Sequence, residues 1–163
     1  MRTALLDALV SLLVLILQTG VAPILGVGHV VPDFLLVWIT ILGLRHGRFA
    51  ATGAGFLLGL LVDLISGSDG MLGLSAFCKS IAGFVAGSFY NENKTARSLG
   101  GRTLLVAVAT AALVHNMVYF VIFLQGAEVG FGEAVLVYAL PSTAYTAAVA
   151  LLPMFVYGRR KGA

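Results

Sequence analysis

The sequence predicts an all-α integral membrane protein, a compact six-helix transmembrane bundle. Of its 163 residues, 60% are hydrophobic and 10% are charged, whereas soluble domains carry about 45–50% apolar and about 25% charged residues. A globular core of this chain length cannot bury so much apolar surface. The composition also excludes a disordered chain, and a single cysteine, Cys78, excludes a disulfide scaffold. No basic run is interleaved with aromatic residues, so we expect no nucleic acid partner.

Six apolar segments have the length that crosses a bilayer, about 17–25 residues. We expect one transmembrane domain, residues 1–163, with spans at about residues 3–22, 27–44, 49–65, 72–90, 102–124 and 134–157. Pro23 ends the first span. This span lacks the small-residue cleavage site of a signal peptide, and hydrophobic sequence continues beyond it. The second span is short and is interrupted by Pro32-Asp33.

Connections and prolines delimit the later spans. A short turn at Ser66–Met71 joins the third and fourth spans into an antiparallel hairpin, and the stretch Asn91–Gly101 separates the fourth from the fifth. Pro141 and Pro153 are expected to kink or end the sixth span. Hydroxyl donors near these prolines could satisfy the carbonyls that they free. These donors are Ser142, Thr143 and Thr146.

The basic residues set the orientation of the chain. Nine of the ten lie before the first span, after the last, or in alternate connections. They are Arg2, Arg45, Arg48, Lys94, Arg97, Arg102, Arg159, Arg160 and Lys161. The other connections hold Asp69, Glu128 and Glu133 and no basic residue. The positive-inside rule therefore predicts that both termini are cytoplasmic, in a multi-pass protein of the bacterial inner membrane, and that the basic loops attract anionic lipids.

Small residues recur at every fourth position on the third and fourth spans. The repeated positions are Ala51, Gly55, Gly59 and Asp63 on the third span, and Ser75, Lys79, Gly83 and Gly87 on the fourth. Two of the runs have the small-xxx-small pattern, which lets helix backbones approach closely. We therefore expect the six small residues of these rows to form a helix-packing seam between the two spans.

The two ionisable residues of these rows, Asp63 and Lys79, are costly in lipid and each requires a partner. If the hairpin turn is centred near Asp69, Gly59 lies level with Lys79. Side chains lean toward the N-terminus of their own helix, so Lys79 and Asp63 would converge. We expect a structural intramembrane Asp63–Lys79 pair that clamps the seam. Asp33, also toward the outer side, is the competing partner for Lys79.

Other polar residues inside the spans are expected to hold helices together. His115 and Asn116 lie near the middle of the fifth span, where interhelical hydrogen bonds are the favoured interpretation. A proton-sensitive switch or a ligand contact is the alternative, and the sequence leaves it open. Gln18, near the outer end of the first span, could cap a neighbouring helix or line a cavity.

No motif in the sequence indicates an enzyme. The chain has no G-x-S-x-G, H-E-x-x-H, Walker loop or C-x-x-C, so we expect no catalytic residues, no metal site and no cofactor. The enzymatic alternative is an intramembrane aspartyl protease that uses Asp33 and Asp63, because two carboxylates can share a proton. The motifs that surround the aspartates of lipoprotein signal peptidases are missing here.

The run Gly55–Ile65 (GFLLGLLVDLI), followed by Gly70–Ala76 (GMLGLSA), resembles the signature of the bacterial rod shape-determining protein MreD family. The segment PDFLL that opens the second span at residues 32–36 does so too. Chain length, six spans and cytoplasmic termini match as well, so the resemblance covers essentially the whole chain and is strongest over about residues 30–90. One departure is Met71, where many members have proline.

The resemblance implies a non-enzymatic membrane subunit of the cell-elongation machinery that organises peptidoglycan synthesis and cell shape. Members of the family bind the single-span protein MreC and work with the RodA glycosyltransferase, a class B penicillin-binding protein and MreB filaments. The family is similar in fold to the substrate-binding subunits of energy-coupling-factor transporters. A homo-oligomer is also compatible with the sequence, and the face that binds MreC is not indicated.

Two rival functions remain. The substrate-binding subunit of a vitamin transporter would need an outer pocket with convergent polar groups, yet the outer loops are short and offer little beyond Asp69, Glu128 and Glu133. A small channel or transporter would need a continuous polar file through the bundle. Lys79, Asp63 and His115 do not supply one.

Overall fold

The structure, a computed structural model, describes residues 2–28, 30–66, 71–123 and 130–159. Every regular element in these ranges is a helix. By length and composition, four stretches are able to cross a membrane: α1 (Arg2–Gly20), α3 (Arg48–Ser66), α6 (Arg102–Phe123) and the stretch Phe131–Arg159. Two further apolar helices, α2 (Phe34–His46) and α4 (Leu74–Gly87), are shorter. The protein is therefore an all-α integral membrane protein, and the count of six spans stays a prediction.

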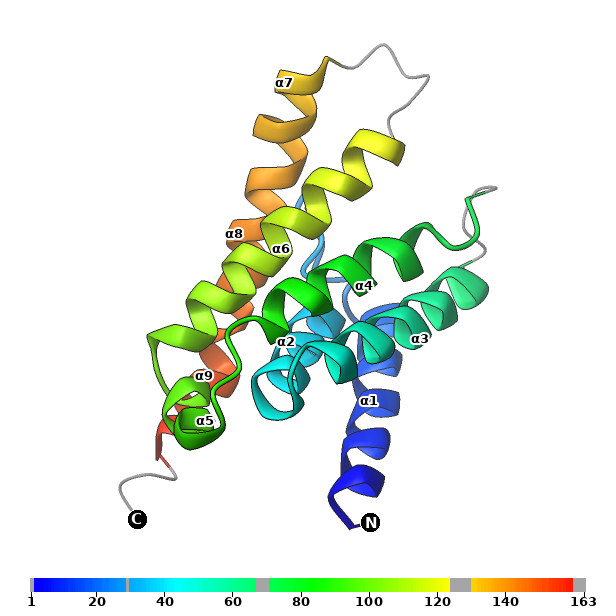
Figure 1. Ribbon diagram of the computed structural model, residues 1–163. Coiled ribbons are helices and arrows are strands. Elements are labelled where there is room, and N and C mark those ends of the chain that lie inside the picture. The colour runs from blue at the N-terminus through cyan, green and yellow to red at the C-terminus, as the bar shows by residue number, and fades with distance from the viewer. Residues whose placement is uncertain (1, 29, 67–70, 124–129, 160–163) are drawn as a thin grey trace.

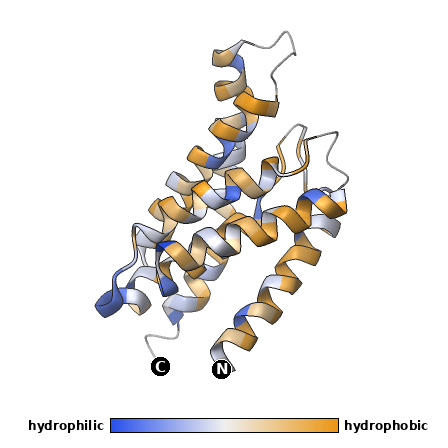
Figure 2. Cartoon of the chain, turned by 45° about the vertical axis from the view of Figure 1, so that its right-hand side comes forward, coloured by the Kyte–Doolittle hydropathy of each residue, from blue (hydrophilic) through white to orange (hydrophobic). Residues whose placement is uncertain are grey.

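Six shorter elements complete the described chain. Between α4 and α6 lie η1 (Glu92–Lys94) and α5 (Thr95–Leu99). The last long stretch consists of α7 (Phe131–Glu133), the π-helix η2 (Ala134–Ala139), α8 (Leu140–Val149) and α9 (Leu151–Arg159). Figure 1 shows that α1 begins, and α9 ends, at the end of the bundle that also holds α5. The end of α3, the start of α4, the end of α6 and α7 lie toward the opposite end. Most of each long helix is hydrophobic, and hydrophilic residues gather near the end where the chain finishes (Figure 2).

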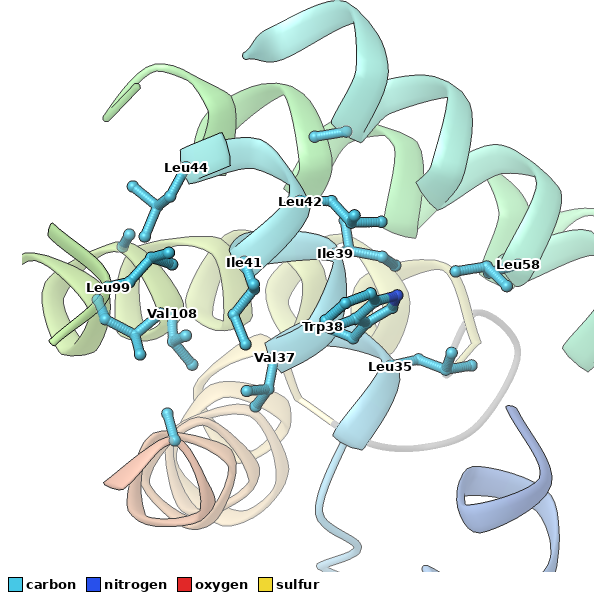
Figure 3. Packing of buried hydrophobic residues seen from close by; sticks show 14 of the residues in the cluster. Leu35, Val37, Trp38, Ile39, Ile41, Leu42, Leu44, Leu58, Leu99 and Val108 are labelled. Carbon is cyan, nitrogen blue, oxygen red and sulfur yellow. The ribbon is translucent and has the colours of Figure 1, made fainter. Parts of the chain in front are cut away.

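Helix α2 is the centre of the packing. Every residue from Leu35 to Leu44 is buried, which is the pattern of a helix that is apolar on all sides and surrounded by other helices. Its side chains point in several directions toward neighbouring elements, including Leu58 of α3 and Val108 of α6 (Figure 3). Helix α1, in contrast, packs at the edge and leaves a long apolar face exposed to the membrane.

The predicted second span is helical only from Phe34 onward. Proline lacks the N–H that a helix requires in its interior, and the helix begins directly after Pro32-Asp33 with Asp33 as its N-cap. The Asp33 Oδ1 atom accepts a hydrogen bond from the Leu36 N–H at 2.8 Å. The span therefore consists of a short helix preceded by irregular backbone.

The two prolines of the last stretch interrupt its helix where expected. Pro141 cannot donate to the preceding turn, and the backbone before it is the π-helix η2. The Thr143 Oγ1 atom adds a hydrogen bond to this turn, because it donates to the Ala139 carbonyl at 2.7 Å. Pro153 follows the break between α8 and α9 at Ala150.

Helices α3 and α4 make the most extensive helix–helix contact in the described part of the chain. A Cβ added at Gly59 would lie 2.6 Å from the Ala76 Cα and from the Ser75 carbonyl oxygen. A Cβ at Gly55 would overlap the backbone carbonyl of Lys79. The same close approach holds for two other small residues of the rows. Gly83 lies against the Ala51 carbonyl, and Gly87 lies against the Arg48 Cα.

These contacts correct the register that the sequence predicted. Lys79 lies level with Gly55 rather than with Gly59, so the two helices are offset by about one turn from the expected pairing. The reason is that each glycine packs against the backbone of a larger residue on the opposite helix. Packing against another glycine would leave the space of two missing side chains unfilled.

The seam leads to a stability prediction at Gly55. We expect Gly55→Ala to lower the free energy of unfolding by about 1–3 kcal/mol, because the added methyl group forces the α3 and α4 backbones apart. Thermal unfolding of the purified protein in detergent measures the change.

Gly53→Ala is the matched control on the same helix, because no atom lies within 4 Å of a Cβ at Gly53. Alanine forms helices better than glycine, so this variant should be unchanged or more stable by up to about 1 kcal/mol. An equal loss of stability in both variants would contradict the role of the seam.

Candidate functional site

Three helices bring ionisable side chains together inside the bundle. Lys79 of α4 donates from its Nζ to the Oδ2 atom of Asp33, the N-cap of α2. His115 of α6 places its Nε2 atom 3.7 Å from the same carboxylate oxygen. The side chains of Lys79 and Asp33 are only 5% and 15% exposed. A buried lysine in an apolar bundle is therefore neutralised by a carboxylate from a different helix.

The predicted Asp63–Lys79 pair is wrong, and its competitor Asp33 takes the place of Asp63. Among the described residues, no ion pair joins Lys79 to Asp63. In the observed register Lys79 is level with Gly55, so Asp63 lies eight residues farther along α3, about 12 Å at 1.5 Å per residue. This offset along the helix explains why the described residues show no Asp63–Lys79 ion pair.

Asp63 instead binds the N-terminus of α4. Its carboxylate accepts hydrogen bonds from the backbone N–H groups of Gly73 (3.0 Å), Ser75 (3.3 Å) and Ala76 (3.2 Å). The first N–H groups of a helix have no partner within the helix and carry a partial positive charge. The buried Asp63 therefore caps its neighbour without a cation, and it fixes the end of the hairpin where α4 begins.

The irregular backbone before α2 is satisfied by side chains from distant helices. The Gln18 Oε1 atom accepts from the N–H groups of Phe34 (2.7 Å) and Leu35 (3.3 Å). The Asp33 N–H donates to Thr146 Oγ1 of α8 at 3.1 Å. Inside a membrane such backbone groups must find partners in the protein. Gln18 thus caps a neighbouring helix, which is one of its two expected roles. The Thr146 hydroxyl accepts a hydrogen bond from the backbone before α2 rather than satisfying a carbonyl of its own helix.

Asn116 joins α6 to α8 by hydrogen bonds. Its Nδ2 atom donates to Thr143 Oγ1 at 3.0 Å and approaches the Ala139 carbonyl at 3.5 Å. This contact is an interhelical hydrogen bond of the kind expected for the pair His115 and Asn116. His115 itself stacks on Tyr119 one turn later, with ring centroids 5.9 Å apart.

These polar groups surround a cavity of about 290 Å³ between the segment before α2 and the helices α4, α6 and α8. Its lining includes Gln18, Asp33, Ser75, Lys79, His115 and Asn116. A second cavity of about 240 Å³ lies beside it, near Asp63 and Ser66 at the end of α3. The candidate functional site is therefore a polar cavity with an ion pair in its wall.

The arrangement of the carboxylates does not resemble a protease dyad. An aspartyl protease needs two carboxylates that share a proton. In the structure Asp33 is bound by Lys79, whereas Asp63 is bound by backbone N–H groups. Within the described ranges, no group of three or more His, Cys, Asp and Glu side chains is placed to hold a metal ion.

A second ionic cluster, which the sequence analysis did not identify, attaches α1 to α2. Asp7 accepts from Arg45 Nη1 at 2.5 Å through Oδ1, and its Oδ2 lies 2.9 Å from His46 Nε2. A further polar contact between the same helices is the hydrogen bond from Trp38 Nε1 to Ser11 Oγ at 2.7 Å. The signal was present in the sequence, because Asp7 is an acidic residue inside an otherwise apolar span.

A double-mutant cycle tests the pairing of Lys79. We expect Asp33→Asn and Lys79→Gln each to lower the free energy of unfolding by about 3–5 kcal/mol, because each leaves one buried charge without its partner. The double variant should lose far less than the sum. Asparagine retains the oxygen that caps α2, so the cycle reports on the charge. Unfolding in detergent at a fixed pH gives the four free energies.

The matched cycle combines Asp63→Asn with Lys79→Gln. Among the described residues these two side chains share no ion pair or hydrogen bond, so the two losses should add within about 0.5 kcal/mol. A strong coupling in this cycle, together with none in the cycle of Asp33, would contradict the observed pairing.

Comparison with known proteins assigns this chain to a family. The model of the family described as rod shape-determining protein MreD matches residues 2–159. No curated protein matches the sequence. The matched range covers every helix of the bundle, including the hairpin of α3 and α4 and the charged residues around the cavity. This chain is therefore a membrane protein of the rod shape-determining protein MreD family, with a role in determining rod shape.

Proposed function

We propose that this chain is a non-enzymatic, multi-pass subunit of the bacterial inner membrane that binds MreC and helps to organise peptidoglycan synthesis during cell elongation. The match of the MreD family model over residues 2–159 carries this proposal. RodA and a class B penicillin-binding protein are the further proposed members of the same complex. We also propose six spans in a single transmembrane domain, residues 1–163, with a fold similar to the substrate-binding subunits of energy-coupling-factor transporters.

The character of the described surface supports a binding role. Large apolar side chains are exposed along α1, α3 and the last helical stretch, where lipid or a partner's transmembrane helix covers them. The glycines of the seam are occupied by the contact between α3 and α4. A partner such as the single span of MreC would therefore dock on a face outside this seam, and the seam itself serves the fold.

The proposed orientation places both termini in the cytoplasm. The support is that α1 begins and α9 ends at the same end of the bundle, together with the basic segment around α5 (Figure 1). Four of the charges used to orient the chain lie outside the described residues, namely Asp69, Glu128, Arg160 and Lys161. The basic loops of the proposed cytoplasmic side would also attract anionic lipids.

Reporter fusions test this topology. A fluorescent protein fused to either terminus should fluoresce, because it folds in the cytoplasm, whereas alkaline phosphatase at the same positions should be inactive. Alkaline phosphatase inserted after Gly130, at the start of α7, should be active. Activity at only one terminus would indicate an odd number of spans and would contradict the proposed orientation.

A detergent pull-down of the tagged protein from its own host tests the proposed partners. We expect MreC to be enriched, with RodA and the penicillin-binding protein, relative to a tagged multi-pass protein of unrelated function. Mass spectrometry identifies the proteins and any bound small molecule, and a second copy with a different tag reports a homo-oligomer. Recovery of a vitamin-like ligand and transporter ATPase subunits, without cell-wall proteins, would overturn the proposal.

A further inference from the structure

The polar cavity contains hydrogen-bonding groups that the fold does not use. Ser75 of α4 and Ser142 of α8 line it, and no hydrogen bond of either hydroxyl is found among the described residues. Asn116 uses its Nδ2 atom for Thr143, whereas its Oδ1 atom has no such partner. The buried His115 Nδ1 atom likewise has none. Within the described ranges, four polar groups on three helices that line one cavity therefore have no hydrogen-bond partner.

Unsatisfied polar groups of this kind are rare in folded proteins, because each costs free energy unless water or a ligand binds it. An apolar bundle has no structural need for a polar cavity of about 290 Å³. The hydroxyls, the amide oxygen and the imidazole nitrogen are placed on separate helices, α4, α6 and α8. They converge as the polar groups of a small-molecule site do.

The cavity adjoins a second one toward one end of the bundle. Val62, Ser75 and Tyr119 line both this cavity and the second one of about 240 Å³. The second cavity also contacts Ser66 at the end of α3 and Met71 before α4. In the proposed orientation this end faces the outside of the cell, so a molecule would enter between α3, α4 and α6.

The charges along this route are already compensated. Lys79 neutralises Asp33 in the wall of the cavity, and Asp63 is held by three N–H groups at the positive end of α4. A ligand with a net charge would add an uncompensated charge to the interior of the bundle. A neutral molecule would add none, and its hydroxyl or amide groups would match the four unused groups.

We propose that the cavity between the segment before α2 and the helices α4, α6 and α8 is an outward-facing binding pocket for a small, uncharged molecule that carries hydroxyl or amide groups. Ser75, Ser142, Asn116 and His115 bind these groups, and the Lys79–Asp33 pair forms the wall. The pocket does not depend on the binding of MreC, and only its outward direction rests on the proposed orientation.

Cysteine modification tests the pocket without knowledge of the natural ligand. Ser142→Cys and Ser75→Cys are each introduced together with Cys78→Ala. A cysteine side chain is close in size to the serine that it replaces. The probes are three methanethiosulfonates that carry a hydroxyethyl group, a sulfonate or a trimethylammonium group. They are added outside spheroplasts, and the modification rate of each variant is measured by mass spectrometry.

Leu72→Cys with Cys78→Ala is the exposed control, since Leu72 is 65% exposed and lies just before α4. The native chain is the buried control, because Cys78 lies beside Lys79 on α4, is fully buried and does not line the cavity. With each rate divided by that at Leu72→Cys, the hydroxyethyl probe should modify both serine positions at least about tenfold faster than either charged probe. Ser75→Cys should react before Ser142→Cys, because it lines both cavities.

Three results would overturn the proposal. The first is no modification at either serine position while Leu72→Cys reacts, since the cavity would then be closed. The second is equal relative rates for charged and neutral probes, which would contradict the class of ligand. The third is equally fast modification of the native Cys78, which would mean that the probe enters through lipid. If Leu72→Cys reacts only in inside-out vesicles, the proposed orientation is wrong. The relative modification rates of the serine variants, measured in those vesicles, then test whether the pocket binds neutral molecules.

Discussion

The ion pair between Lys79 and Asp33 is the interaction on which the rest of the bundle depends. A lysine in the middle of an apolar helix is tolerated only beside an opposite charge, and Asp33 supplies it from the start of α2. This requirement fixes where α2 begins, because Asp33 is also its N-cap. The carboxylate therefore neutralises α4 and starts the central helix, while Gln18 and Thr146 hold the backbone next to it.

The sequence predicted the architecture well because its strongest signals are local. Apolar segments of sufficient length, prolines at their interruptions and basic residues between them identify helices without any tertiary information. The break at Pro32-Asp33 and the close approach of Gly55 and Gly83 to the opposite backbone were visible in this way. What the sequence could not give was the number of helices that cross fully, since α2 and α4 are shorter than the apolar segments that contain them.

The candidate site was less predictable because it depends on register and on contacts between distant segments. A shift of one turn in the hairpin moves Lys79 away from Asp63, so Lys79 pairs with Asp33 instead. No local sequence pattern distinguishes the two registers. The role of Asp63 as a cap also depends on where α4 begins, which is at Leu74 rather than earlier. His115 and Asn116 were recognised as polar residues of the interior, but their cavity is formed by several helices together with the segment before α2.

The order of the charged residues along the chain has a consequence for biosynthesis. Asp33 is translated before Lys79, and α2 and α3 both precede α4, so the segment with the carboxylate leaves the ribosome before the lysine does. The insertion machinery therefore receives α4 when its counter-ion is already present, and the costly state of an isolated ammonium in lipid is short. Asp63 meets its own partners in the next helix to be made. Lys79 thus pairs with a segment made two helices earlier, and Asp63 accepts from the helix that is made next, so the bundle can assemble as it is inserted.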